Sequence, residues 1–292
     1  MITKNNKINI NTKKVDLSFN KKALILLALM LMALLLIIFV AGCGNGNGSS
    51  STDPVQIFDP NADIQDTVFL GASSNFAILA SGEITNIATS AITGDIGLTP
   101  NAGSNISGFS VPLNCPEVTG TIYAVDATGP ACSMIDPTQL TNAKSAAQIA
   151  YIDARSALRG TPQSVSGNLN GITLYPGLYE SGTSLEISAG GLLYLDAQGD
   201  GESIFIIRSA TSITTESTSE VVLTNGAKAA NVYWTAGSAV TLGTNSSMKG
   251  TIIAGTSISL LTGSNLEGRA LNQGAAAEAI TLDSCTITVP SP

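Results

Sequence analysis

The chain has 292 residues, enough for one large domain or two small ones, and it contains no histidine. The absence of histidine excludes His-based nucleophile triads, His general bases and His-ligated metals. Only 12% of the residues are charged and 5% are aromatic, which excludes a coiled coil, a helical repeat and a nucleic-acid binder.

The charge changes sign at Cys43. Residues 1–43 contain six lysines and one aspartate, for a net charge of +5, whereas the remainder has seven basic and twenty acidic residues, for a net charge of −13. The acidic part should be repelled by phosphate backbones. It is rich in Thr, Ser, Gly, Ala, Val and Ile, which favours β-structure with many tight turns.

The amino-terminal lysines precede an uninterrupted apolar run from Ala23 to Val40, whose eighteen residues would rise about 27 Å as a helix. Such a pattern predicts an export signal. The run ends in Val40-Ala41-Gly42-Cys43, which resembles the bacterial lipobox and implies cleavage before Cys43 and lipidation of its thiol. The alternative is an uncleaved signal anchor. Both interpretations predict an exported protein tethered to a membrane, at the cell surface or on the periplasmic face.

The pattern predicts three segments along the chain: an export signal in residues 1–43, a flexible Gly/Asn/Ser linker in 44–66 and a folded domain in 67–290. Within that domain Cys115 and Cys132 lie 17 residues apart in loop-like sequence. An oxidising compartment permits a disulfide there, worth about 3 kcal/mol. We interpret Cys285, in a predicted strand, as an inert buried thiol. We expect neither a metal site nor a cofactor.

One helix is predicted, over residues 137–159. Asp136 is a good N-cap and Pro137 is favoured at the first helical position, whereas Gly160 and Pro162 end the helix. Small apolar residues recur at steps of three and four and predict a narrow packing stripe. The stripe comprises Leu140, Ala143, Ala147, Ala150, Ala154 and Leu158.

Short apolar segments separated by Gly, Asn and Ser follow from Ile172 onward. Residues 204–210 match residues 231–237 at an offset of 27, and Trp234 then aligns with Ile252 at an offset of 18. The step of 18 recurs once, and a step of 22 precedes the last coil. This register predicts a β-solenoid with parallel coils, of which about seven would span roughly 34 Å. The alternative, a β-sandwich, predicts hairpin turns and no such register.

Alternation within each predicted coil places one hydroxyl-bearing residue after a buried apolar residue, and in three of the four coils a second apolar residue follows it. These outward positions are Thr214, Thr241, Ser259 and Thr281. Three residues further along, each coil has a second hydroxyl, and a bend after the strand would bring it onto the same face. These second positions are Ser217, Thr244, Thr262 and Ser284. Ser and Thr favour strands and turns for other reasons, but a pattern kept in phase by four coils predicts a functional ladder.

Several motifs along the chain are similar to those of the microbial ice-binding proteins. They are Ile92–Gly97, Leu174–Tyr179, Leu195–Asp200, Asn231–Trp234, Leu242–Ser246, Gly250–Ala254 and Gly268–Leu271. The resemblance covers about Phe69 to Pro290, with the motifs in family order. It implies a mainly β fold, a right-handed discontinuous parallel β-solenoid with one long α-helix packed alongside. It also implies a disulfide stapling the cap region, as between Cys115 and Cys132, and ice binding by a flat face with Thr-X-X-Thr-like motifs. We expect a monomer whose partners are the ice surface and the membrane.

The predicted face departs from a regular one at three outward positions, Glu216, Leu261 and Asp283. Exposed carboxylates hold water in geometries unlike ice, so we expect moderate activity, or binding on a different face.

Two other classes of function remain open at this stage. A surface adhesin or glycan-binding module would need exposed aromatic platforms, and aromatic residues are few. A polysaccharide lyase or hydrolase would need clustered carboxylates and an Arg base. Its candidate acids are Asp95, Asp196, Asp200 and Glu202, and its candidate bases are Arg208 and Arg269. The acids after Leu195 belong to a Gly-rich turn, where Asp is common for backbone reasons, so we do not expect an enzyme.

Overall fold

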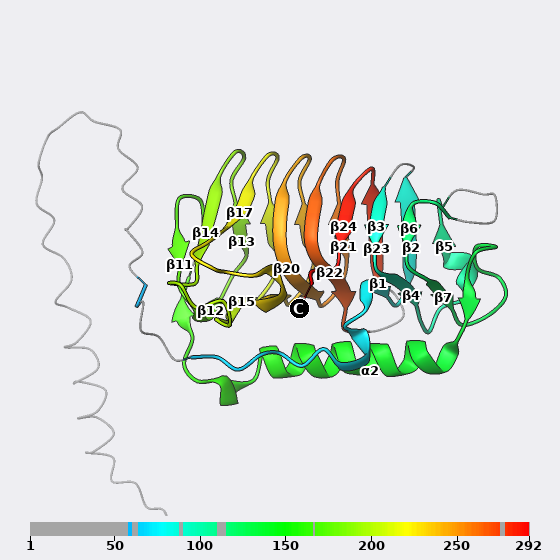
Figure 1. Ribbon diagram of the computed structural model, residues 1–292, viewed down its shortest axis with the longest axis horizontal. Coiled ribbons are helices and arrows are strands. Elements are labelled where there is room, and N and C mark those ends of the chain that lie inside the picture. The colour runs from blue at the N-terminus through cyan, green and yellow to red at the C-terminus, as the bar shows by residue number, and fades with distance from the viewer. Residues whose placement is uncertain are drawn as a thin grey trace, which may run out of the picture. The chain divides into compact units, whose positions relative to one another are not determined.

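The computed structural model describes residues 58–59, 64–87, 90–109, 115–165, 167–274 and 278–291. Cys43 and the apolar run before it therefore lie outside the described residues. In the described part, all strand pairs are parallel, and they form a three-faced solenoid with one long helix alongside (Figure 1). The sandwich alternative is thereby excluded, and the predicted fold class is confirmed.

Face A is the side of the solenoid next to the helix. Its strands, in stacking order, are β9 (Gln163–Ser164), β12 (Gly177–Ser181), β15 (Phe205–Ser209), β18 (Val232–Ala236), the second halves of β20 (Ser247–Ala254) and β22 (Asn265–Asn272), β1 (Phe76–Ala80), β4 (Asp95–Leu98), β7 (Ile122–Ala124) and β8 (Met134–Ile135).

Face B follows face A along each coil. Its strands, in stacking order, are β10 (Gly167–Asn168), β13 (Leu185–Ile187), β16 (Ile213–Thr215), β19 (Val240–Leu242), β21 (Ile258–Leu260), β23 (Ala279–Asp283), β2 (Glu83–Ile87) and β5 (Ile106–Ser107).

Face C completes each coil. Its strands are β11 (Thr173–Leu174), β14 (Leu192–Asp196), β17 (Glu220–Thr224), the first halves of β20 and β22, β24 (Thr286–Thr288), β3 (Ala91–Thr93) and β6 (Val118–Thr119). Short 3-10 helices lie between some strands: η1 (Gly71–Ser73), η2 (Gly103–Asn105), η3 (Ala157–Arg159) and η4 (Ala229–Asn231).

The register of the coils is the one that the repeat predicts. Ile207 pairs with Trp234 at the offset of 27, Trp234 pairs with Ile252 at 18, and Ile258 pairs with Ile280 at 22. The inward side chains fill the interior, including a fully buried Trp234 whose indole nitrogen donates to the Lys249 carbonyl at 2.8 Å.

The stack does not follow the order of the sequence. β23, near the carboxyl end, pairs with β2 from the amino-terminal part, so Thr281 lies beside Thr85. The amino-terminal coils therefore continue the stack beyond the last coil, and face B has eight strands, one more than the seven expected coils. α2 (Pro137–Ala154) spans this discontinuity, because it follows the amino-terminal coils and leads back along the stack to β9 (Figure 1).

The amino-terminal end of α2 is as predicted and its carboxyl end is not. The Asp136 side chain accepts a hydrogen bond from the Gln139 amide at 2.9 Å, and five of the six predicted stripe residues are fully buried. Leu158, the sixth, is 97% exposed. The helix ends at Ala154: Ser156 is extended and its hydroxyl accepts from the Leu158 amide at 3.1 Å. Arg208 of β15 caps this end by donating to the carbonyl oxygens of Ala154 and Ser156, at 2.6 and 3.0 Å.

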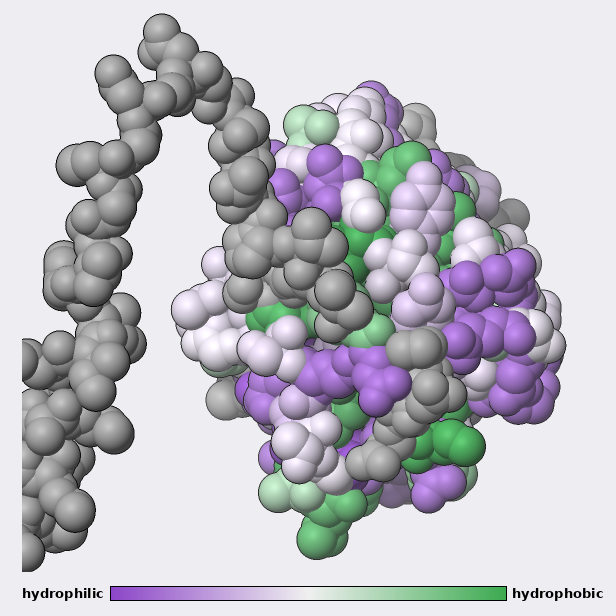
Figure 2. All heavy atoms as spheres, turned by 90° about the vertical axis from the view of Figure 1, so that its left-hand side faces the viewer, coloured by the Kyte–Doolittle hydropathy of each residue, from purple (hydrophilic) through white to green (hydrophobic). Residues whose placement is uncertain are grey.

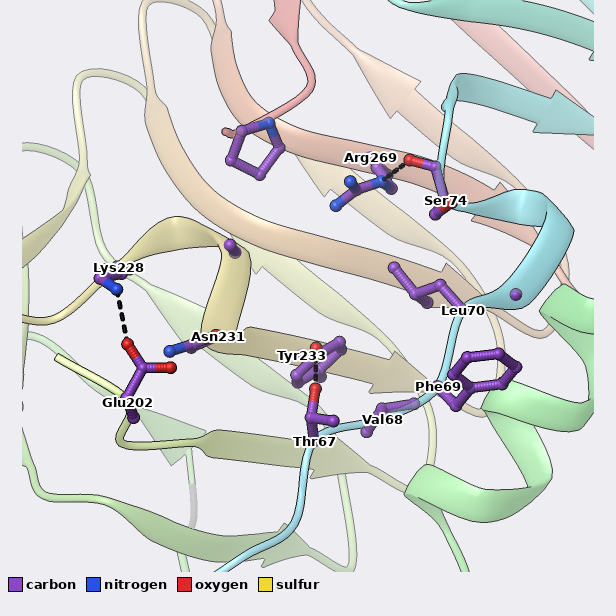
Figure 3. A pocket seen from close by; sticks show the side chains of 13 residues that line it. Thr67, Val68, Phe69, Leu70, Ser74, Glu202, Lys228, Asn231, Tyr233 and Arg269 are labelled. Carbon is purple, nitrogen blue, oxygen red and sulfur yellow. Dashed lines mark hydrogen bonds and ion pairs between the residues drawn. The ribbon is translucent and has the colours of Figure 1, made fainter. Parts of the chain in front are cut away.

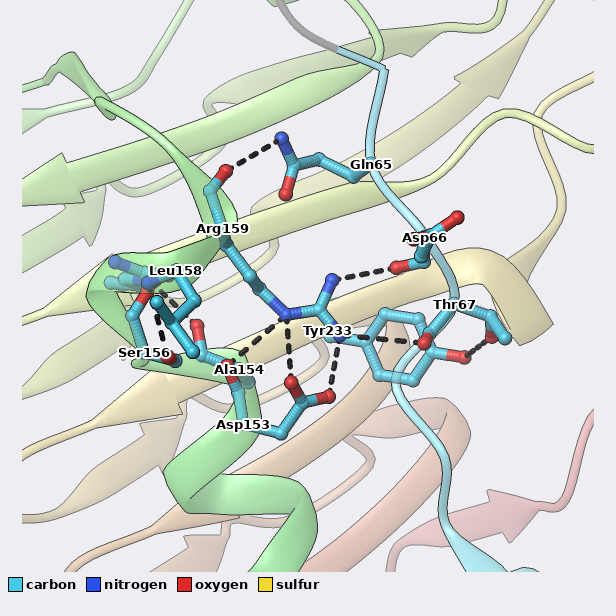
Figure 4. A network of polar contacts seen from close by, with 10 residues as sticks. Gln65, Asp66, Thr67, Asp153, Ala154, Ser156, Leu158, Arg159 and Tyr233 are labelled. Carbon is cyan, nitrogen blue, oxygen red and sulfur yellow. Dashed lines mark hydrogen bonds and ion pairs between the residues drawn. The ribbon is translucent and has the colours of Figure 1, made fainter.

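The segment from Ile64 to Leu70, here named the strap, lies beside α2 and leads into β1 (Figure 1). Val68 and Leu70 are buried in the cluster that joins face A to α2. Figure 4 shows how Arg159 fixes the strap: its Nη1 donates to the Asp66 carbonyl at 2.6 Å, and its carbonyl accepts from Gln65. The folded body therefore includes part of residues 44–66, the predicted linker. Among the described residues, no helix is long and apolar enough to cross a membrane.

Candidate functional site

Face B aligns the four central predicted hydroxyl residues in one column. Thr214 pairs with Thr241, Thr241 with Ser259, and Ser259 with Thr281. We name these four residues the central column. The column continues into Thr85 and Ser107 of the amino-terminal coils, which the sequence repeat did not include. At its other end it runs into Glu186 and Asn168.

The hydroxyls of the central column face solvent. Each residue stands between two side chains buried in the interior, as Thr241 does between Val240 and Leu242. No protein atom in the described part of the chain hydrogen-bonds to these four hydroxyls, so they are available to water. Thr85 differs, because its hydroxyl donates to the Glu83 carboxylate at 2.9 Å.

The second predicted set, Ser217, Thr244, Thr262 and Ser284, stacks at the corner between faces B and C. Hydrogen bonds between adjacent coils link its members, for example from the Asn245 amide to the Thr262 carbonyl at 3.0 Å. The residue after each of the first three has a positive φ, which turns the chain toward face C. These side chains therefore lie along the edge of face B, not on its flat part.

The corner between β23 and β24, in the last coil of the sequence, is one residue shorter than the corner between β21 and β22. Leu260 pairs with Leu282 at an offset of 22, whereas Leu266 pairs with Ile287 at 21. Ser284 itself consequently has the positive φ, 47°. Thr262 donates to the Asp283 carboxylate, so its hydroxyl is already engaged.

A second column on face B was missed by the sequence analysis. It lies two residues before the central column and consists of small side chains: Ser184, Ser212, Ala239, Ser257 and Ala279. Hydrogen bonds from Ile213 to the Ala239 carbonyl and from Val240 to the Ser257 carbonyl, at 3.1 and 2.9 Å, keep it in register. One residue earlier, Thr211, Ser238 and Thr256 are linked in the same way. Applying the offsets of 27 and 18 to Thr211, three residues before Thr214, gives Ser238 and Thr256, so the sequence repeat contains these residues.

The other side of the central column is irregular, as predicted. Glu216 and Leu261 are exposed, and Asp283 lies beside Ile87, which is 54% exposed. The regular part of face B therefore extends toward face A. We name it the hydroxyl block; it comprises Ser212, Thr214, Ala239, Thr241, Ser257, Ser259, Ala279 and Thr281. It carries no charge, and Glu186 and Glu83 border it on the neighbouring strands.

Buried polar side chains hold the corner beside the hydroxyl block. Ser209 donates from its hydroxyl to the carbonyls of Thr183 and Ser212, at 2.8 and 2.9 Å, and Asn272 donates to the Thr256 carbonyl. Because interior groups satisfy these carbonyls, the outward hydroxyls do not have to, and the block keeps its geometry without using its own polar groups.

The predicted disulfide and the predicted buried thiol are both present, but Cys285 lies at the corner between β23 and β24 and not in a strand. Cys115 and Cys132 form a disulfide with a Cα–Cα distance of 6.1 Å. Cys285 is free and buried, and burial raises the pKa of its thiol. It occupies the corner position that is serine in the neighbouring coils, where Ser90 and Ser264 stand.

The candidate catalytic residues do not form a cluster. The Asp95 carboxylate accepts from the Thr121 amide, and the Asp196 carboxylate accepts from Gln198 and Asn225. Asp200 similarly accepts from the amide of Glu202 within their turn. Arg208 caps α2, as described above. No group of three or more metal-binding side chains occurs among the described residues. These acids and arginines therefore have structural partners.

A pocket of about 540 Å³ lies between the strap and face A (Figure 3). Arg269 is its most buried charge and donates to the Ser74 carbonyl at 2.7 Å, while Thr67 and Tyr233 share a hydrogen bond. Burial lowers the pKa of the Arg269 guanidinium. Lys228 and Glu202 form an ion pair at the rim, at 2.8 Å. Of these contacts, the hydrogen bond between Thr67 and Tyr233 joins the strap to face A. Phe69 is the one strongly exposed aromatic side chain in the described ranges, so a glycan-stacking platform is not formed there.

Known proteins resemble this chain in both sequence and fold. A sequence model of the family described as Ice-binding-like matches residues 78–288. An ice-binding protein of Flavobacterium frigoris (strain PS1) is 37% identical over 241 residues, which cover 82% of this chain and 83% of that protein. The crystal structure of an ice-binding protein from an Antarctic biological consortium superposes with a TM-score of 0.69 at 35% identity, covering 81% of this chain and 97% of that one. A domain of ice-binding protein 1 of Shewanella frigidimarina gives 0.71 at 29% identity, covering 79% and 100%.

Proposed function

The chain belongs to the ice-binding protein family, and we propose that it adsorbs to ice through the hydroxyl block of face B. The observation that carries the proposal is the central column, four hydroxyls in register without a hydrogen-bond partner among the described residues. We propose ice as the partner on this ground together with the family membership.

The geometry of a parallel solenoid suits a lattice. Equivalent side chains on adjacent strands lie about 4.8 Å apart, and residues i and i+2 of one strand lie about 6.6 Å apart. The central column of Thr and Ser has the first of these spacings, and the column of Ser and Ala lies beside it, just before β16, β19 and β21. These spacings are near the oxygen repeats of ice planes.

The chemistry of the block complements this spacing. Threonine offers a hydroxyl that anchors water and a methyl that keeps the face partly apolar, and its χ1 is restricted in a strand. The array is therefore ordered before it meets ice, which lowers the entropic cost of binding. Many weak contacts act together, so a bound molecule blocks growth of the ice front without any catalytic group. We expect a monomer to suffice.

Thr241→Tyr tests the proposal, because a bulky ring at the centre of the block prevents close approach to a flat ice surface. We expect the fluorescently labelled Thr241→Tyr variant to leave a growing ice hemisphere uncoated, whereas the labelled wild type coats it. Thr93→Tyr, at an exposed threonine of face C, is the matched control and should coat ice normally. Circular dichroism checks that both variants fold. If Thr93→Tyr fails and Thr241→Tyr succeeds, the site lies on face C instead.

We further propose that the amino-terminal segment tethers the domain to the cell envelope. The support is the sequence alone: six lysines, the apolar run to Val40, the lipobox-like Cys43 and a polar linker. On this proposal the protein is exported and works outside the cytoplasmic membrane, with Cys43 carrying the lipid.

A further inference from the structure

Large apolar side chains are exposed along the α2 side of the molecule. Ile149 and Ile152 project from α2 with 62% and 61% of their surface exposed. Leu158, just beyond the helix, is 97% exposed, and Ile64 and Phe69 of the strap are 96% and 76% exposed. We name these five residues the helix-side patch. In Figure 2, hydrophobic side chains project at the lower edge of the molecule, the α2 side of Figure 1.

The five residues come from α2, the segment just beyond it and the strap, which lies beside α2 (Figure 1). The Phe69 ring lies against Gly71, which itself faces Ala146 of α2, one helical turn before Ile149. Ile149 and Ile152 are three residues apart and so share one side of the helix. The Gln65 side chain donates to the Arg159 carbonyl at 3.2 Å, which joins the strap to the segment that contains Leu158 (Figure 4). The patch is therefore formed jointly by α2, the residues just beyond it and the strap.

The charge of this region differs from that of the remaining domain. Residues 137–160 and the strap together contain Lys144, Arg155 and Arg159 against Asp66 and Asp153, a net charge of +1. The chain after residue 43 has a net charge of −13. Lys144 and Arg155 donate to the solenoid carbonyls of Asn272 and Ser209, and Arg159 pairs with Asp153, so the helix side is close to neutral and repels anionic headgroups less than an acidic surface would.

The first described residues are Phe58, which is buried against Tyr179, and Asp59; the described chain resumes at this patch. Ile64 opens the strap, and the apolar run from Ala23 to Val40 lies upstream, joined to the strap by a polar linker. We propose that the helix-side patch docks on the surface of the lipid bilayer that holds the amino-terminal anchor. This inference rests on the tether proposed above, and its ligand is the interfacial region of the membrane, into which exposed apolar side chains partition.

Docking there would orient the molecule. Figure 1 shows α2 on one side of the solenoid and the turns between faces B and C on the opposite side. With α2 against the bilayer, that corner points away from the membrane and face B stands clear of it. The hydroxyl block would thus remain open to ice outside the cell.

An introduced tryptophan measures the contact. The single native tryptophan, Trp234, is fully buried and serves as an internal reference. The full chain with Ile152→Trp is reconstituted in vesicles of phosphatidylcholine and phosphatidylglycerol, with and without bromine on the acyl chains. We expect the added emission to be lost in brominated vesicles. The matched control, Glu220→Trp at an exposed position of face C, should emit equally in both.

The outcomes separate docking from the tether and from ice binding. Flotation of the full chain with the vesicles without quenching of Ile152→Trp would overturn docking and leave the tether intact, whereas absence of flotation would overturn both. Self-association in detergent that Ile149→Ser and Ile152→Ser abolish would place a second copy on the patch and also overturn lipid docking. The same serine variants should coat ice as the wild type does, so ice binding is tested independently.

Discussion

The side chain of Thr241 illustrates how single residues define the surface of face B. Its neighbours Val240 and Leu242 are fully buried, so the backbone leaves Thr241 only an outward position. Its β-branch then limits the directions that the hydroxyl can take. Ser259, in the next coil, keeps the hydroxyl but has neither the methyl nor the same rotamer restriction. Threonine positions therefore contribute more order to the hydroxyl block than serine positions do.

Lys144 predicts a pH dependence of stability. Burial lowers the pKa of its ammonium from 10.5 to about 8, and Glu278 partly offsets this. Between these values the unfolded chain binds more protons than the folded chain, so the free energy of unfolding rises with pH. Lys144→Met lacks this contribution. We expect urea denaturation to show the wild type gaining stability relative to the variant as the pH rises from 8 to 10.5. A difference that does not change with pH would contradict this.

The pKa shifts of Cys285 and Tyr179 lower the stability of the fold as the pH rises, which is opposite to the effect of Lys144. For this reason the experiment measures the difference in stability between the wild type and Lys144→Met. Burial raises the pKa of the Cys285 thiol and raises the pKa of Tyr179 to about 12. Each keeps its proton longer when folded, so each contribution to stability is lost as the pH rises above the unfolded pKa. Both groups are present in the wild type and in Lys144→Met, and their effects cancel.

The packing of α2 on face A depends on small side chains. Ala147 is fully buried in the middle of the stripe, against a surface that includes Ile206, Tyr233 and Ile253. We expect Ala147→Leu to lower the free energy of unfolding by about 1–3 kcal/mol, because the helix cannot move away without breaking its other contacts. Gln148→Leu, at the adjacent exposed position, is the control and should change stability little. Equal effects in denaturant titrations would show that the stripe is not tightly packed.

The sequence predicted this element well where the signal was local and poorly where it was not. Asp136 and Pro137 mark the start of α2, and the spacing of alanines marks its buried side, because these preferences act within one or two turns. At the other end, Ser156 caps the short helix η3 and is a local signal that the alanine spacing outweighed. Arg208, which caps the carbonyl end of α2, is 54 residues beyond Ala154 in sequence, and no pattern near Leu158 could reveal it.

The same contrast applies to the candidate site. The offsets found the central column because it repeats within consecutive coils. They missed Thr85 and Ser107, since these residues join the column only through the pairing of β23 with β2. They also placed Ser284 with Thr262: the Gly263 amide donates to the Ser284 carbonyl as the Asn245 amide does to the Thr262 carbonyl, but the shortened corner gives Ser284 itself a positive φ. Local repetition is readable from one sequence, whereas a contact between distant coils is not.

At the scale of the whole molecule, the ends of the chain and the ends of the stack do not coincide. The coil containing β23 and β24 lies near the carboxyl end of the sequence but between β21 and β2 in the stack. The coil containing β10 and β11 lies in the middle of the sequence but at the end of the stack. Coils with a neighbour on each side should open only with the whole structure, while terminal coils fray.

Hydrogen exchange tests this arrangement directly. We expect the amides of Ile280, Leu282 and Ile287 to be protected as strongly as those of Val240 and Leu242 in the middle of the stack. The amides of Leu169 and Leu174 should exchange faster, because β10 and β11 pair with strands on one side only. In a solenoid stacked in sequence order the reverse would hold, since the carboxyl-terminal coil would be an end. Rapid exchange at Ile280 and Leu282 would therefore show that β2 does not cover β23 in solution.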